Sequence, residues 1–338
     1  MEEIIPASPK ERVQAQKGLS KTAARAGAAI SVWVLLRIAF EFATTPVVHY
    51  LQSRGASDNL LQIAALAMSA VGVYIIATPI ALWILGVFRN GGIKAIFAKS
   101  RMPARELAAA IPMAYAAAIS VNLVATIVML VSSGSIDEVA AQNPFLNLPT
   151  GVLGIVLNYL WMVAVAPIFE EILFRGGILR AFLPYGSWFA VVVSGLLFGL
   201  AHVNIAQMLY ATVLGMLLGI IYVRAHSVVP CIITHLCINF LGITVATFVG
   251  GQNPVILGLF GLLIAAAVIT GLVLIIITLT SRRDRLRLGN NCPALTRRHK
   301  LSTLLHSPLF VLMFALSLAL SIAVNIPSIA EAIFGIWS

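Results

Sequence analysis

Charged residues are scarce in this sequence, and their scarcity indicates the class of protein. Asp, Glu, Lys and Arg make up only 10% of the 338 residues, whereas apolar residues make up 60%. A soluble domain carries about 25% charged residues and at most about half apolar ones. The composition therefore excludes an ordinary soluble enzyme and indicates a polytopic membrane protein. Although the net charge is +10, we expect the basic residues to orient the chain in a lipid bilayer and not to bind nucleic acid.

Cysteine is also scarce, with three residues in the chain: Cys231, Cys237 and Cys292. They form neither an even, spaced set nor a CxxC motif, which excludes a disulfide framework and a cysteine-based metal knuckle. Residues 1–26 are polar and basic and contain no short apolar run followed by a cleavage site. We therefore predict no secretory signal peptide.

Long apolar runs, in contrast, occupy most of the chain. A run of about 20 apolar residues spans a bilayer as a helix. We therefore expect an all-α fold, a polytopic membrane helical bundle of about eight to nine transmembrane helices. The candidate segments are 27–48, 60–88, 107–132, 151–169, 188–203, 206–223, 228–249, 255–280 and 308–326.

The basic residues predict the orientation of these segments. If the N-terminus is cytoplasmic, 20 of the 22 Lys and Arg residues fall on the cytoplasmic side, in agreement with the positive-inside rule. We therefore expect a multi-pass protein of the cell membrane with a cytoplasmic N-terminus and an external C-terminus. Residues 1–26 are expected to form a cytoplasmic basic tail, and residues 281–306 a basic cytoplasmic loop.

The fifth apolar segment is unusually short. Residues 188–203 make a helix of roughly 24 Å at 1.5 Å per residue, and the next segment begins almost at once. We therefore expect the turn between them not to reach the far surface. Irregular backbone at that depth needs protein or water around it, so His202 and Asn204 are expected to line a wet cavity.

A few ionisable residues interrupt the apolar segments, at a cost of about 2.5–3.5 kcal/mol each on insertion scales. The stretch APIFEEILFRGG, residues 166–177, contains Glu170, Glu171 and Arg175. Adjacent glutamates point about 100° apart on a helix, so they are not expected to do the same job. Glu171 and Arg175 are four residues apart and can pair, which leaves Glu170 free to face another helix. Alternatively, the cluster marks only the cytoplasmic end of the helix.

Two further motifs place polar side chains on one helix face each. FGLAH brings Phe198 and His202 together, and HLCIN brings His235 and Asn239 together. A carboxylate and an imidazole can hold and deprotonate a water molecule, and a second imidazole with an amide can donate to an oxyanion. Two histidines and a glutamate can also bind zinc, and a lone histidine in a membrane helix is often a packing residue.

Arg37 and Glu41 form another ionisable pair within an apolar segment. They lie four residues apart with opposite charges, which is the spacing of neighbours on one helix face. Because the sequence shows no third partner, we interpret them as a self-compensating pair and not as part of a catalytic site.

The three motifs together resemble those of a known family. EEILFR fits EExxxR, FGLAH fits FxxxH and HLCIN fits HxxxN. Their order and spacing are similar to those of the CPBP family, the CAAX proteases and bacteriocin-processing enzymes, also called Abi, which includes the type II CAAX prenyl proteases. The resemblance covers roughly residues 150–250. It implies an intramembrane endopeptidase with a four-helix catalytic core, which we assign to residues 151–250, between N-terminal helices in 27–150 and C-terminal helices in 251–338.

The resemblance also implies roles for the motif residues. Glu170 and His202 would activate the water, and His235 and Asn239 would form the oxyanion hole. In a supporting position lie Glu171 and Arg175. The implied mechanism is metal-free, so we expect no cofactor. In the alternative with zinc, the ligands would be Glu170, His202 and His235.

The expected substrate is a membrane-associated peptide or protein, with or without a prenyl group. Two other functions stay open: a non-catalytic scaffold or regulator of the same family, and a transporter that uses the charged cluster as an ion site. The absence of an inverted repeat argues against the transporter.

Catalysis sets a geometric condition as well. Glu170 and His202 meet only if the helix of residues 151–169 continues past Glu171 towards Phe182 while the following helix stays short.

Overall fold

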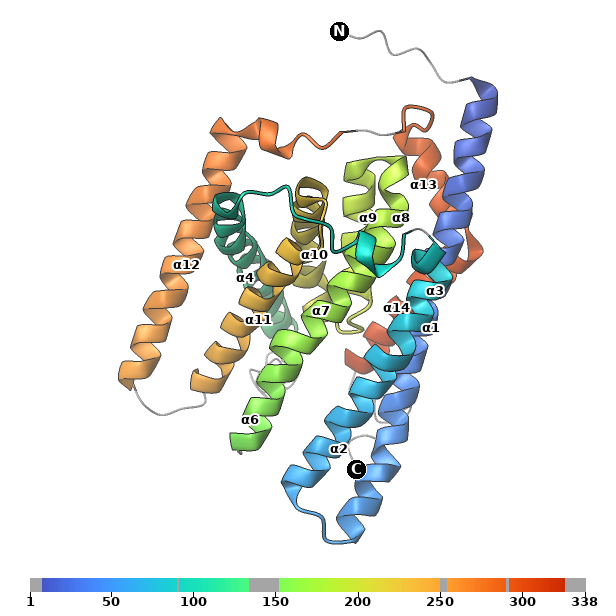
Figure 1. The fold of residues 1–338 in the computed structure, drawn as a ribbon. Helices are drawn as coiled ribbons and strands as arrows, with labels where there is room; N and C mark the ends of the chain where they lie inside the picture. The colour runs from blue at the N-terminus through green and yellow to red at the C-terminus, as the bar shows by residue number, and fades with distance from the viewer. Residues whose placement is uncertain (1–7, 90, 134–151, 250–253, 290–291, 326–338) are drawn as a thin grey trace.

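The computed structural model describes residues 8–89, 91–133, 152–249, 254–289 and 292–325. These residues form helices, turns and connecting segments without any strand, which confirms the predicted all-α fold (Figure 1). The ends of the chain, residues 1–7 of the expected basic tail and residues 326–338, lie outside the described residues. The same holds for residues 134–151, which fall at the boundary between the expected N-terminal helices and the catalytic core.

The helices vary widely in length, and three of them are π-helical segments (η1, η4 and η5). Their bounds are α1 Pro9–Ser53, α2 Asp58–Ala70, η1 Val71–Ala77, α3 Thr78–Leu85, α4 Ala104–Ser133, α6 Val152–Asn158, η4 Tyr159–Val165, α7 Ala166–Glu171, η5 Ile172–Leu179, α8 Arg180–Phe182, α9 Ser187–Leu200, α10 Ile205–Ala225, α11 Val229–Val249, α12 Pro254–Ser281, α13 Arg297–Leu305 and α14 Pro308–Asn325. Short 3-10 turns occur at η2 Val87–Arg89, η3 Ile93–Ala95, η6 Leu183–Tyr185 and η7 Arg283–Leu286.

Six helical stretches among the described residues are long and apolar enough to cross a membrane, so the chain is a multi-pass membrane protein. The number rises to seven if α13 and α14, which are bent by 74°, count as one broken span. The apolar stretches Ser187–Leu200 and Val229–Thr244 are shorter. The expected count of eight to nine spans is therefore not confirmed. The six stretches are Pro9–Ser53, Asp58–Leu85, Ala104–Val131, Val152–Tyr185, Gln207–Ala225 and Leu257–Ser281.

The first helix begins within the expected basic tail. Ser8 caps α1 through a reciprocal capping box with Glu11, and Pro9 occupies the first helical position, two features that favour helix initiation. Leu19 and Ala23 of this polar stretch are fully buried. Residues 9–26 are therefore continuous with the first apolar segment, and part of this stretch packs against the bundle.

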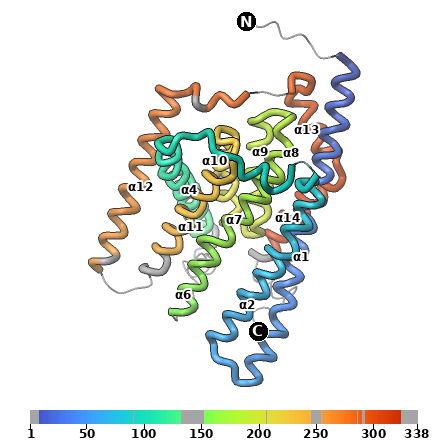
Figure 2. Tube along the Cα trace, viewed as in Figure 1, coloured from blue at the N-terminus to red at the C-terminus, as the bar shows by residue number. Residues whose placement is uncertain are grey.

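The fourth apolar segment forms a continuous helical stretch from Val152 to Tyr185, which runs through the middle of the bundle (Figure 1). It passes through both π-helical segments η4 and η5, on either side of α7. After Tyr185 the chain reverses, and α9 runs back beside α8 (Figure 2). The helix thus continues past Glu171 to Phe182, and α9 has only 14 residues. Both parts of the geometric condition are met.

Glycines let α9 and α10 pack closely, as small residues do at helix crossings in membranes. A Cβ atom at Gly199 would overlap the Thr212 hydroxyl and come within 2.5 Å of the Met208 carbonyl oxygen. A Cβ atom at Gly215 would lie 3.0 Å from the Cα atom of Gly195. This close crossing fixes the position of the α9 C-terminus, where the FGLAH motif ends.

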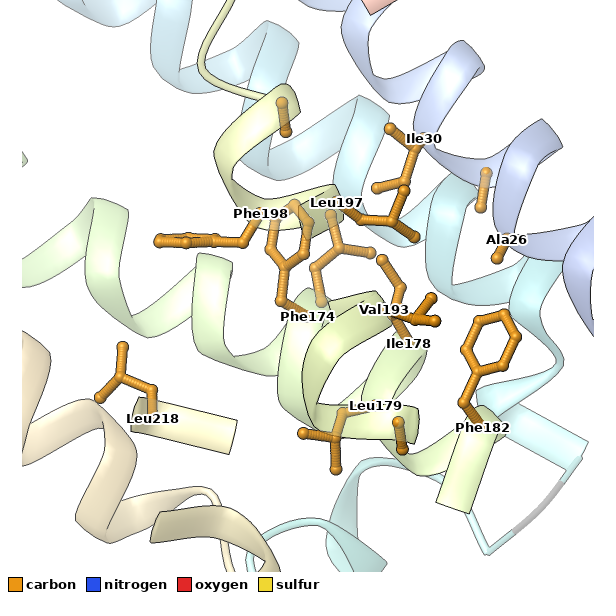
Figure 3. Packing of buried hydrophobic residues seen from close by; sticks show 14 of the residues in the cluster. Ala26, Ile30, Phe174, Ile178, Leu179, Phe182, Val193, Leu197, Phe198 and Leu218 are labelled. Carbon is orange, nitrogen blue, oxygen red and sulfur yellow. The ribbon is translucent and has the colours of Figure 1, made fainter. Parts of the chain in front are cut away.

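The buried core lies around the middle of the bundle, where α1, η5 and α9 meet. Figure 3 shows Phe174 and Phe198 beside each other, with Leu197 and Ile30 in the same cluster. The two phenyl rings meet edge to face at a centroid distance of 5.0 Å, a preferred arrangement for aromatic pairs. The core therefore fixes η5, which contains Arg175, against α9, whose C-terminus leads into His202.

Candidate active site

Glu171 and Arg175 form the ion pair that their spacing predicts. Arg175 Nε lies 3.0 Å from Glu171 Oε2, and both side chains are completely buried. Arg175 Nη2 also donates to the Gly215 carbonyl oxygen at 3.0 Å. The pair belongs to the interior of the bundle and not to an exposed helix end. A buried pair of charges is tolerated only when good geometry and further hydrogen bonds offset its desolvation.

His235 lies between the two adjacent glutamates. Its Nδ1 donates to Glu171 Oε1 at 2.9 Å, and its Nε2 lies 3.9 Å from Glu170 Oε2. The two carboxylates therefore face opposite nitrogens of one imidazole. Glu171 orients the ring, whereas Glu170 stays beyond hydrogen-bond distance and retains its oxygens for another partner.

His202 is held by its own helix. Its Nδ1 lies 2.8 Å from the Phe198 carbonyl oxygen, which can only accept, so Nδ1 carries the proton and Nε2 keeps its lone pair. The residue stands at the C-terminus of α9, in a short turn where Val203 has a φ of 54° and Asn204 caps α10 through its side-chain oxygen. A positive φ is rare for a β-branched residue and often marks a functional site.

The Phe198 side chain joins the polar groups to one another. Its ring centroid lies 4.9 Å from that of His202, 5.7 Å from that of His235 and 5.0 Å from that of Phe174. Arg175 Cζ lies 4.5 Å from the same ring, a cation–π contact. Arg175 Nη1 has no hydrogen-bond partner among the described residues. The cation–π contact with the ring therefore offsets part of the cost of burying this nitrogen. Phe198 therefore holds two imidazoles and a guanidinium around one rigid side chain.

Asn239 makes a contact that a π-turn explains. Its Nδ2 donates to the Met162 carbonyl oxygen at 2.8 Å. In η4 the Ala166 amide bonds to the carbonyl five residues earlier, that of Trp161, so the same spacing would pair Met162 with Pro167, which has no amide hydrogen. Asn239 satisfies this carbonyl and keeps a second amide hydrogen for another acceptor.

The structure brings Glu170, Glu171, Arg175 and His235 together directly, and His202 joins them through Phe198. No hydrogen bond or ion pair between the described side chains of Glu170 and His202 exists, so their expected pairing at a water molecule stays a prediction. Within the described ranges, no three His, Cys, Asp or Glu side chains converge on a common metal position. Both the zinc alternative and the expected absence of a cofactor stay untested predictions.

The N-terminal helices supply two residues that their sequence pattern did not assign to the site. Arg37 Nη1 donates to the Ala201 carbonyl oxygen at 3.4 Å, next to His202. Tyr74 packs its ring on Trp161 and Phe169 at centroid distances of 4.9 and 5.0 Å. The charge of Arg37 and the Tyr74 hydroxyl both interact electrostatically with Glu170.

The expected pairing of Arg37 with Glu41 is wrong. Glu41 is exposed and none of the ion pairs among the described residues includes it. Arg37 points instead towards the C-terminus of α9, where the unpaired carbonyl groups of a helix attract a cation. The signal available in the sequence was the arginine itself, a costly residue within a membrane helix.

Part of the chain is similar to a known protein family. Residues 152–241 match the family described as Type II CAAX prenyl endopeptidase Rce1-like, which confirms the resemblance inferred from the three motifs. The matched family is a protease family, so the match supports a hydrolase at the family level. Comparisons with curated proteins and with solved structures find no significant match.

Proposed function

Starting from the likeness of residues 152–241 to the Rce1-like family, we propose that the chain is a glutamate-dependent intramembrane endopeptidase. Its substrate is a membrane-associated peptide or protein, in which it hydrolyses one peptide bond. The observation that carries the proposal is the His235 imidazole between two carboxylates, one of which is fixed by Arg175 while the other keeps its oxygens free.

In this mechanism Glu170 is the general base. A water molecule donates one hydrogen bond to the Glu170 carboxylate and one to His202 Nε2, which leaves a lone pair directed at the substrate carbonyl carbon. As the oxygen–carbon bond forms, the proton passes to Glu170. The C–N bond then breaks, and Glu170 returns the proton to the departing amine, which restores the carboxylate.

The oxyanion of the tetrahedral intermediate requires donors. The second amide hydrogen of Asn239 is one. His235 Nε2 is the other when the ring is an imidazolium, because its Nδ1 proton is already directed at Glu171. Glu171 and Arg175 do not touch the substrate in this scheme, and their role is to hold the imidazole.

The test uses purified protein in proteoliposomes and a quenched library of farnesylated and unmodified peptides. Glu170→Gln preserves shape and removes the base, so we expect cleavage to fall by about 100- to 10,000-fold. Glu106→Gln is the matched control, because Glu106 of α4 pairs with Arg224 of α10 and belongs to none of the three motifs. The library also shows whether a prenyl group is required. Activity abolished by a chelator would contradict the metal-free mechanism.

If neither the wild type nor Glu170→Gln cleaves any peptide, this result would contradict the peptidase and favour the scaffold or regulator.

We further propose that the protein resides in the cell membrane with its N-terminus in the cytoplasm. A reporter that is active only in the cytoplasm, fused before residue 1, tests this orientation. A silent N-terminal reporter on folded protein would contradict it.

A further inference from the structure

Arg37 lies on a face of α1 that is fixed against the candidate active site, although α1 lies outside the matched residues 152–241. One helical turn earlier, the Trp33 ring meets Phe174 edge to face at 6.3 Å. Trp33 Nε1 also donates to the Thr78 hydroxyl at 3.1 Å. Because residues four apart share a helix face, these contacts direct Arg37 towards the same part of the core.

The guanidinium of Arg37 is close to the reacting groups. Its Nη1 donates to the carbonyl oxygen of Ala201, the residue before His202. Its charge acts electrostatically on both Glu170 and His202. The Arg37 guanidinium is therefore held at the residue before His202, and its charge acts on both the proposed base and the proposed water-binding imidazole.

No carboxylate within the described part of the chain forms an ion pair with this cation. Glu41 on its own helix is exposed, and the Glu170 carboxylate lies 3.9 Å from His235 Nε2 and is not paired with Arg37. A single hydrogen bond of 3.4 Å uses one of five N–H donors. The partly buried guanidinium thus keeps the donors that bind a carboxylate in bidentate geometry.

We propose that Arg37 binds a carboxylate of the peptide substrate and holds that end of the peptide beside Glu170 and His202. This inference rests on the proposed function and narrows its substrate class to peptides with a carboxylate near the cleaved bond. An ionised base would otherwise repel an anionic peptide, and Arg37 offsets that repulsion. The carboxylate is either the C-terminus of the peptide or an Asp or Glu side chain.

The test compares peptides that differ only in their carboxylate. One pair ends in a free acid or an amide, and a second pair, both amidated, has Asp or Asn beside the cleaved bond. We expect the wild type to prefer the acid of at least one pair. Arg37→Gln should lower kcat/KM for that acidic peptide about 10- to 100-fold, mainly through a higher KM. The kcat/KM for the neutral peptide of the same pair should change less than about threefold. Arg37→Lys should retain part of the preference, because it keeps the charge but loses the fork geometry.

Glu41→Gln is the matched control on the same helix and should leave kcat/KM for all four peptides unchanged. An equal loss of kcat for acids and amides in Arg37→Gln would overturn the proposal and show that Arg37 only positions the turn that carries His202. A wild type without preference in either pair would overturn it as well.

Binding separates this inference from the peptidase itself. Fluorescent forms of the same peptides are titrated onto wild type, Arg37→Gln and Glu170→Gln. Tighter binding of the acid that is lost in Arg37→Gln supports the carboxylate site even if no peptide is cleaved. Equal affinity for acid and amide in the wild type refutes the site, whether or not the protein is a peptidase.

Discussion

The buried ion pair gives the sharpest test of the site's architecture. Arg175→Met removes the guanidinium but keeps much of the apolar volume, and it leaves the Glu171 carboxylate without its cation. Both side chains are fully buried and 3.0 Å apart, so no solvent can replace the lost partner. Breaking one side of such a pair typically lowers the free energy of unfolding by about 3–5 kcal/mol. The hydrogen bond to the Gly215 carbonyl is lost as well.

A second ion pair of the same kind provides the control. Arg224 and Glu106 are closer, at 2.7 Å, but their side chains are 30% and 19% exposed. Arg224→Met should therefore lower the free energy of unfolding by only about 0–1 kcal/mol. The double variant Glu171→Gln with Arg175→Met removes both buried charges and should recover most of the stability lost in Arg175→Met, without recovering activity.

The assay is a denaturant titration of the detergent-solubilised protein, followed by tryptophan fluorescence. Equal destabilisation by Arg175→Met and Arg224→Met would refute the reasoning, because burial would then not decide the energy of the pair. A double variant as unstable as Arg175→Met would refute it too, because the loss would then come from packing and not from an uncompensated charge.

Two further predictions concern the helices that carry the site, and the same titration measures both. Gly199→Ala should lower the free energy of unfolding by about 1–3 kcal/mol through overpacking. Its control is Gly258→Ala, which has open space around its Cβ position and should leave the free energy of unfolding unchanged or slightly higher. Equal effects of the two substitutions would contradict the close crossing of α9 and α10. Asn239→Ala should lower the free energy of unfolding by about 1–3 kcal/mol, because it leaves the Met162 carbonyl unpaired. Adding Pro167→Ala should reduce this loss of stability, because alanine supplies an amide hydrogen to that carbonyl. A cost unchanged in the Pro167→Ala background would contradict the π-turn account.

Local spacing along one helix was predictable because helix geometry fixes it. Residues four apart share a face, and this rule places Arg175 at Glu171 and His202 at Phe198, as found. The short fifth segment likewise predicted a helix that ends early, and α9 has 14 residues. The same rule failed for Arg37 and Glu41. Glu41 is exposed, whereas tertiary packing brings Arg37 to a carbonyl at the C-terminal end of α9.

The sequence by itself determined the membrane class, the helical fold and the identity of the three motifs, because composition, run length and i,i+4 spacing are local properties. Only the tertiary structure decided which groups meet. It placed one imidazole between both glutamates, paired Asn239 with a carbonyl freed by a π-turn, and brought Arg37 from the first helix to the site. These contacts join segments far apart in the chain, and their geometry depends on how helices pack against one another, which no spacing within a single helix contains.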